Sequence, residues 1–198
     1  PSSFQGSAGQ AVALDAGTYG VTEMLVSGYE PHYSIDCAGS IAVGETKTCT
    51  ITNADQAPTL TLVKTVINNN GGTKVVSDFP LFVNGNPVTS GVPVTLAANT
   101  LYTASETGAY GYLASAWGGN CATDGTITLK PGEHKTCTIT NDDISPTLTV
   151  IKQIVPESDN GKFNLQIDSV TKVVNVSDNG TTGAVNVNAG THTVGETA

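Results

Sequence analysis

Apolar and polar residues alternate with a period of two along most of this chain, in short runs separated by turn-forming residues. One clear run places Leu60, Leu62 and Lys64 on one face, with threonines on the other. This alternation is typical of a β-strand that has one face on a core and the other in solvent. Turn signals, such as the Asn-Asn-Asn-Gly-Gly of residues 68–72, separate the runs. Many short strands with such turns predict an all-β sandwich or barrel.

Three of these strands carry one polar residue on an otherwise apolar face. Lys64 is the first, Asn141 shares a face with Cys137, and Glu106 shares a face with Ala104. An unpaired buried charge costs several kcal/mol and is tolerated only with partners. We therefore expect the lysine, the glutamate and the asparagine to meet one another in the core.

The same strands recur along the chain with a period of 88 residues. The Lys-Thr-Cys-Thr-Ile-Thr-Asn of residues 47–53 returns unchanged at 135–141, and the Pro-Thr-Leu-Thr-Leu-Val-Lys of 58–64 returns as Pro-Thr-Leu-Thr-Val-Ile-Lys at 146–152. Self-similarity at a fixed period is the signature of a repeat architecture. The repeat therefore sets the domain organisation of the chain.

A third recurring strand has Tyr or His, then three residues, then Glu, at residues 19–23, 102–106 and 192–196. Ordering the recurring strands predicts one complete module at residues 58–143. The later part of another module precedes it at 1–55, and the first part of a third follows at 146–198.

Short linkers, residues 54–57 and 142–145, join the last strand of one module directly to the first strand of the next. They favour a stiff string of modules over independent tethered domains. The partial modules allow two accounts: a slice of a longer array, or a subunit that polymerises head to tail. The second account would supply the Tyr/His…Glu strand twice, so we favour the slice.

Composition supports the all-β interpretation and narrows the partners. Charged residues make up only 13% of the chain, and Lys plus Arg number 8 against 17 Asp plus Glu, a formal charge of −9. This balance makes nucleic acid and anionic membranes improbable partners. No apolar run approaches the ~20 residues of a membrane helix, so we expect no membrane insertion in this segment. The sequence begins without Met and shows no signal peptide or sorting tail, so we expect a processed product or a fragment.

The four cysteines form two local pairs, Cys37 with Cys49 and Cys121 with Cys137, and none has metal-site spacing with a neighbouring Cys or His. Two disulfides are the simpler interpretation, and free buried pairs are the alternative. Disulfides imply an oxidising, extracellular setting. We expect no metal and no cofactor.

At these residues the chain resembles the prealbumin-like, Cna-B-type and SpaA-type β-sandwich modules of bacterial surface proteins and pilins. The marks are Lys64 in the first strand, Glu106 in a Tyr-x-x-x-Glu strand followed by Gly111-Tyr112, and Asn141 closing the last strand. The resemblance covers nearly the whole chain. It implies tandem antiparallel sandwiches, Ig-like or transthyretin-like, with one complete central module between two partial ones.

The resemblance also implies chemistry for the three polar residues. In that family the lysine amine and the asparagine amide form an intramolecular isopeptide bond while the glutamate moves protons. Burial suits this reaction, because it disfavours the ammonium form of lysine. A buried ion pair hydrogen-bonded to an amide is the alternative for Lys64, Glu106 and Asn141.

The partial modules hold incomplete sets of these residues. Glu23 and Asn53 have no lysine, and Lys152 and Glu196 have no asparagine. If subunits complete each other, Lys152 of one copy would bond to Asn53 of the next.

Two Asn-x-Ser/Thr sequons, at Asn175 and Asn179, are candidate glycosylation sites, although chance sequons are common in such a composition. Asp-Asn-Gly clusters at residues 159–161 and 178–180 lack the acidic spacing of a calcium loop and predict turns. Trp117, near Tyr110 and Tyr112, could mark a ligand patch or pack against the disulfide.

The leading functional hypothesis is a structural subunit or repeat segment of an extracellular cell-surface fibre, pilus or stalk. Its partners would be other copies or neighbouring modules, and covalent glycans. No enzyme is expected beyond a single self-bonding event. The alternatives are an adhesin that binds a glycan or protein, and a transthyretin-like hydrolase.

Overall fold

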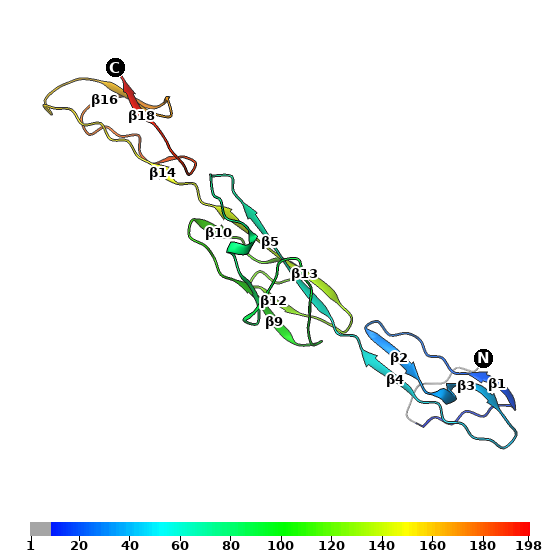
Figure 1. Ribbon diagram of the computed structural model, residues 1–198. Coiled ribbons are helices and arrows are strands. Elements are labelled where there is room, and N and C mark those ends of the chain that lie inside the picture. Colours follow the sequence, from blue (N-terminus) through cyan, green and yellow to red (C-terminus); the bar gives the residue numbers. More distant parts are fainter. Residues whose placement is uncertain (1–8) are drawn as a thin grey trace.

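The computed structural model describes residues 9–198, and they form three groups of β-strands that follow one another along a line (Figure 1). We refer to them as the N-terminal segment (residues 9–55), the central segment (58–143) and the C-terminal segment (146–198). Apart from two short 3-10 helices, the regular structure is entirely β, as the alternation predicts. Within residues 9–198, no helix combines the length and apolar character needed to cross a membrane.

The central segment contains two sheets. The first has the order β10–β13–β5–β8, with β11 also beside β13; its strands are β5 (Thr59–Ile67), β8 (Val94–Thr95), β10 (Tyr112–Ala114), β11 (Gly118–Gly119) and β13 (His134–Asp143). The second has the order β12–β9–β6–β7; its strands are β6 (Leu81–Val83), β7 (Asn86–Val88), β9 (Leu101–Glu106) and β12 (Thr126–Thr128). The 3-10 helix η2 (Val76–Asp78) lies between β5 and β6.

The two sheets pack face to face on one apolar core. Leu60 and Leu62 of β5 and Ile139 of β13 meet Val83 of β6 and Ala104 of β9 there, and all five are buried. Burying a large apolar side chain stabilises a fold by about 1.5–3 kcal/mol. The period-two pattern thus predicts the inner faces of β5, β9 and β13 correctly.

β5 and β13 run parallel over nine residue pairs, from Thr59 opposite His134 to Ile67 opposite Asp142. The other pairings of the two sheets are antiparallel. The expected antiparallel sheets therefore contain one parallel exception. Its reason is the path of the chain, which enters the segment along β5 at one end and leaves along β13 at the other (Figure 1).

The N-terminal segment holds two small antiparallel sheets. β1 (Gly17–Gly20) pairs with β3 (Ala38–Ile41), and β2 (Tyr29–Tyr33) pairs with β4 (Ile51–Asp55); the 3-10 helix η1 (Ile35–Cys37) lies between β2 and β3. Tyr29 lies opposite Asp55 in the way that Tyr112 lies opposite Asp143. β2 and β4 therefore correspond to β10 and β13.

The C-terminal segment holds a different subset of strands. β14 (Thr147–Leu148) pairs with β17 (Val185–Asn186), and β15 (Phe163–Ile167) lies between β16 (Val170–Val176) and β18 (Val194–Thr197). Leu165 lies opposite Glu196 as Leu81 lies opposite Glu106, so β15 and β18 correspond to β6 and β9. Within residues 9–198, no strand of this segment takes the place of β13.

Backbone hydrogen bonds hold the segments to one another. Gln56 N donates to Gly28 O at 2.8 Å, and Gly132 N of the central segment donates to Gln56 O at 2.6 Å. At the other end, Ala189 N donates to Asn70 O at 2.6 Å. Gly28 has a φ of +83°, and a Cβ there would collide with the Pro131 carbonyl. The linkers are thus docked on the segments that they join.

Candidate functional site

The candidate site lies between the two sheets of the central segment and draws one residue from each of three strands. Lys64 of β5 lies opposite Ile139 of β13, so Asn141 is two residues further along the neighbouring strand. Paired residues of adjacent strands point to the same face of a sheet, and Lys64, Ile139 and Asn141 are all buried. Glu106, at the end of β9, faces them from the opposite sheet.

Lys64 and Glu106 form a buried ion pair. Lys64 Nζ donates to Glu106 Oε2 at 2.6 Å, and the two side chains are 0% and 7% exposed. The Nζ atom also lies 4.7 Å from the centre of the Phe79 ring. Burial lowers the pKa of Lys64 below its usual value, and the hydrogen bond and charge of Glu106 oppose this only in part. The neutral amine is therefore easier to reach here than in water.

Asn141 is buried beside this pair with its amide unused. Its Oδ1 and Nδ2 atoms, together with Oε1 of Glu106, are buried without a hydrogen-bond partner. They are three of the four such side-chain atoms within residues 9–198, the fourth being Oδ1 of Asp142. Each unsatisfied buried group costs about 1–3 kcal/mol, and folded proteins seldom leave several in one place. An amine and a primary amide are also the reactants of transamidation, and a carboxyl buried with them can carry the protons.

The C-terminal segment repeats part of this arrangement near its surface. Lys152 Nζ lies 2.8 Å from Glu196 Oε2 and 3.9 Å from the centre of the Phe163 ring. The side chains of Lys152 and Glu196 are 15% and 46% exposed. A shallow cavity of about 220 Å³ adjoins them, lined also by Val150, Ile151, Leu165, Val194 and Gly195. The ion pair thus forms without an asparagine and remains in contact with solvent.

The N-terminal segment holds the complementary residues. Asn53 of β4 is exposed, and its Nδ2 donates to Glu23 Oε2 at 3.3 Å. The lysine of this segment, Lys47, forms a surface pair with Glu45 at 2.8 Å. Asn53 therefore contacts Glu23, whereas Lys47 is paired with a different glutamate.

Both predicted disulfides are present, Cys37–Cys49 and Cys121–Cys137. Cys137 lies in β13, and Cys49 lies two residues before β4. Each is bonded to a cysteine earlier in its own segment. Cys137 is fully buried in the central core. Closing loops of this length adds about 2–4 kcal/mol by the chain-entropy estimate.

The carboxylate of Asp143 holds the loop of residues 69–72 through backbone hydrogen bonds, which the side-chain pattern did not predict. It accepts backbone N–H bonds from Asn69 at 2.9 Å, Asn70 at 2.9 Å and Gly72 at 2.6 Å. Burial acts to raise the pKa of Asp143, but these hydrogen bonds outweigh it and the pKa is lowered. The recurrence of this aspartate as Asp55, 88 residues earlier, was the one available signal.

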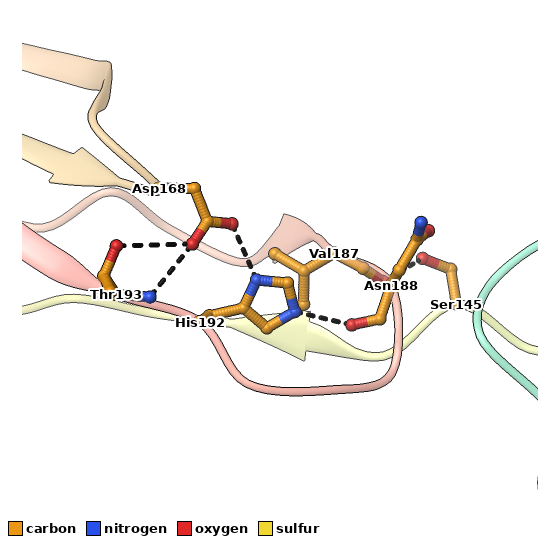
Figure 2. A network of polar contacts seen from close by, with 6 residues as sticks. All are labelled: Ser145, Asp168, Val187, Asn188, His192 and Thr193. Atoms are coloured by element: carbon orange, nitrogen blue, oxygen red, sulfur yellow. Dashed lines mark hydrogen bonds and ion pairs between the residues drawn. The ribbon is translucent and has the colours of Figure 1, made fainter.

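His192 forms a second network, where the C-terminal segment meets the central one (Figure 2). Its Nδ1 lies 2.7 Å from Asp168 Oδ2, and its Nε2 lies 2.6 Å from Asn188 O. Both partners are acceptors, so both ring nitrogens must carry a proton to satisfy them. The Asn188 carbonyl, and then Asp168, raise the pKa of His192. The sequence placed His192 only in the recurring Tyr/His…Glu strand.

The other candidates lie apart from these sites. Trp117 packs against the central core and Tyr112 against Phe79, while Tyr110 is fully exposed, so the three aromatic residues do not gather in one patch. The sequon residues Asn175 and Asn179 are exposed, and their glycosylation stays a prediction. Within residues 9–198, no group of three or more Cys, His, Asp or Glu could hold a metal ion.

Comparison with known families identifies the central segment. Residues 55–139 match a family model described as a prealbumin-like fold domain, SpaA_2. The resemblance to SpaA-type prealbumin-like modules is therefore confirmed for residues 55–139, which include Lys64 and Glu106 and end before Asn141. A search of the curated proteins finds no match.

Proposed function

We propose that this chain, whose residues 55–139 are a SpaA-type prealbumin-like fold domain, is a structural segment of a cell-surface fibre, pilus or stalk. In this proposal its three segments are tandem modules of one fold, and an isopeptide bond between Lys64 and Asn141 locks the central one. The observation that carries the lock is the set of buried atoms without partners at Glu106 and Asn141, directly beside a lysine of lowered pKa.

The reaction needs only groups that the site contains. Lys64 passes a proton along its 2.6 Å hydrogen bond to Glu106, which leaves a neutral amine and a neutral carboxyl. The amine attacks Cγ of Asn141 while the Glu106 carboxyl donates a hydrogen bond to Oδ1, and a tetrahedral intermediate forms. The attacking nitrogen loses a proton, Glu106 relays one proton to Nδ2, the bond from Cγ to Nδ2 breaks, and the nitrogen leaves as ammonia. The products are one Lys–Asn amide and one ammonia.

This reaction occurs once in each module, so it is maturation and not enzymatic turnover. It also removes both buried charges, because the lysine ammonium and the primary amide become one neutral amide and Glu106 ends as a neutral carboxyl. Glu106 is regenerated as the carboxyl. The site therefore has no role for a separate substrate.

The structural role is supported by the rest of the chain. Two disulfides imply an oxidising environment outside the cell. The pairings of β2 with β4 and of β15 with β18 repeat central pairings, which favours tandem modules. The exposed sequons Asn175 and Asn179 are candidate sites for covalent glycans on such a stalk.

The intact mass of the full chain under reducing, denaturing conditions tests the lock. We expect the mass to fall short of the sequence mass by one ammonia, and a peptide map to join the peptides of Lys64 and Asn141. Glu106→Gln should retain the full mass, because it keeps the side-chain volume and loses the proton carrier. A full-mass wild-type chain would exclude the isopeptide bond and leave a stalk braced by disulfides alone.

A further inference from the structure

The register between β5 and β13 is not fixed by a turn. In a hairpin, the turn type and the loop length determine which residues lie opposite each other. β5 and β13 are parallel, however, and β6 to β12 lie between them along the chain. The Cys121–Cys137 disulfide ties β13 to the chain just before it and not to β5. The register of this pair therefore depends on side-chain contacts and on how the ends of the two strands are held.

A shift of β13 by two residues would keep the same side chains facing the core. Successive side chains of a strand point to opposite faces, and Asn141 and Asp143 are both on the buried face of β13. Such a shift could bring Asp143 opposite Val66, the place that Asn141 occupies. A carboxylate there has no amide nitrogen to lose as ammonia. The register thus decides whether Lys64 meets an amide or an acid.

Asp143, at the end of β13, binds the loop that directly follows β5. Its buried carboxylate accepts the N–H bonds of Asn69, Asn70 and Gly72 already described. Asn70 Nδ2 also donates to the main-chain carbonyl of Asp143 at 2.9 Å. We call this set of contacts the Asp143 clasp. It joins the end of β13 to the end of β5 through residues 69–72.

The clasp fits only the register that is observed. A strand rises about 3.3 Å per residue, so a two-residue shift would carry Asp143 about 6.6 Å along the sheet and out of hydrogen-bond reach. The fit is also close, because a Cβ added at Gly72 would lie 2.7 Å from Asp143 Oδ2. Hydrogen bonds to an ionised acceptor are about twice as strong as neutral ones. A shifted β13 would lose several of them at once.

The clasped loop also borders the lysine side of the candidate site. Tyr112, which lies opposite Asp143, accepts a hydrogen bond from Lys74 N at 3.0 Å at the far end of the loop. Its ring packs against the Phe79 ring with 5.3 Å between the centres, and Phe79 in turn lies 4.7 Å from Lys64 Nζ. The loop therefore contacts the end of β13 and, through two aromatic rings, the wall beside the amine.

We propose that Asp143 is a positioning residue for the bond between Lys64 and Asn141: its clasp on residues 69–72 holds β13 in the observed register and so presents the amide to the amine. This inference rests on the proposed function, because it concerns the same bond. Within residues 9–198, Asp143 has no side-chain hydrogen bond to Lys64, Glu106 or Asn141. It acts through the position of the strand, and the reacting groups stay those of the site.

Refolding of the full chain tests this role. Chain recovered from inclusion bodies in urea is checked for its full sequence mass, which shows that it has not reacted. After dilution into neutral oxidising buffer, Trp117 fluorescence follows folding, and intact mass after quenching and reduction follows the loss of ammonia. Asp143→Asn should fold and then lose ammonia roughly 10- to 100-fold more slowly than wild type, because small misplacements of reacting groups cost factors of this size.

A matched control and a rescue show whether register is the cause. Asp142→Asn removes the same charge from the opposite face of β13 and leaves the clasp intact, so its rate should equal that of wild type. Thr65 and Thr140 lie opposite each other on the outer faces of β5 and β13. Thr65→Cys with Thr140→Cys should therefore form a disulfide in the observed register. Added to Asp143→Asn, this disulfide should restore most of the rate.

Equal rates for wild type and Asp143→Asn, or no recovery once the added disulfide has formed, would overturn the inference and leave the proposed bond intact. If Asp143→Asn does not fold, Asn70→Ala takes its place, because it keeps the carboxylate and removes the side-chain bond to the Asp143 carbonyl. It should slow the ammonia loss by a smaller factor, and an unchanged rate would count against the clasp. A wild-type chain that folds and keeps its full mass would instead exclude the bond itself, and the positioning role with it.

Discussion

The central and C-terminal segments contain the same lysine, glutamate and phenylalanine in two different environments. Lys64 and Glu106 are 2.6 Å apart and nearly inaccessible, whereas Lys152 and Glu196 are 2.8 Å apart and partly in solvent. The distances are alike because β5 and β9 have close counterparts in the C-terminal segment. The exposure differs because β13 does not. In the central segment, β5 and β9 therefore assemble the ion pair, and β13 shields it from water.

This difference decides what each pair contributes. An exposed pair is screened and is worth about 0–1 kcal/mol. A buried pair must overcome the cost of removing two charges from water, so losing one partner leaves a charge that is hard to accommodate. Losing one member of the pair should therefore change the free energy of unfolding strongly only in the central segment, where β13 covers the pair.

The largest expected difference between the two segments is the loss of stability when the lysine is replaced. We expect Lys64→Met to lower the free energy of unfolding of the central segment by about 3–5 kcal/mol, because Glu106 and Asn141 stay buried without it. Lys152→Met should cost the C-terminal segment about 0–1 kcal/mol. Urea unfolding followed by the fluorescence of Trp117, the one tryptophan, reports the central segment, and hydrogen exchange of residues 146–198 reports the other.

A double variant sharpens this result. Lys64→Met with Glu106→Leu should recover much of the loss, because an apolar pair of similar volume needs no desolvation. Similar losses for Lys64→Met and Lys152→Met would show that coverage by β13 does not set the contribution.

The two disulfides should differ in which segment they stabilise. Replacing Cys121 and Cys137 by alanine should cost the central segment about 2–4 kcal/mol. Replacing Cys37 and Cys49 should leave the Trp117 unfolding midpoint unchanged, because that bridge lies within the N-terminal segment. A shift of the Trp117 midpoint in the second variant would mean that the two segments unfold together.

Asp143 gives the central segment a sensitivity to acid. Its pKa is lowered in the folded chain, so its contribution is present above the unfolded-state pKa and is lost as the pH falls through the folded-state value. We expect Asp143→Asn to lower stability at neutral pH and to flatten the acid limb of the Trp117 unfolding profile. Asp55→Asn should leave that profile unchanged.

The smallest effect is expected at His192, in the opposite pH direction. Its pKa is raised, so the stabilisation is complete below the unfolded-state pKa and is lost as the pH rises through the folded-state value. We expect an NMR titration of the imidazole to give a pKa above that of an unfolded peptide. The protection of the Ala189 amide from hydrogen exchange should fall as the pH rises through this range. His192→Tyr, which introduces the residue found at Tyr102, should remove that pH dependence.

Much of the fold could be predicted because it depends on which side chains are apolar and on where the cysteines lie, and both can be read from the sequence. Alternation identified the inner faces of β5 and β13, and the local spacing of the cysteines identified both pairs. Asp143 and His192 could not be placed in the same way, because each has a backbone partner, the Asn70 N–H and the Asn188 carbonyl, that leaves no residue pattern. The parallel pairing of β5 with β13 was also missed, since alternation is the same for either direction.

That parallel pairing has a mechanical consequence. Because the chain enters the central segment along β5 and leaves along β13, a pull on the two ends draws these strands in opposite directions along their length. The hydrogen bonds between them are then loaded together in shear, whereas a hairpin pulled at its open end would unzip one bond at a time. A bond from Lys64 to Asn141 would join these two strands directly, and residues 65–140 would carry none of the load.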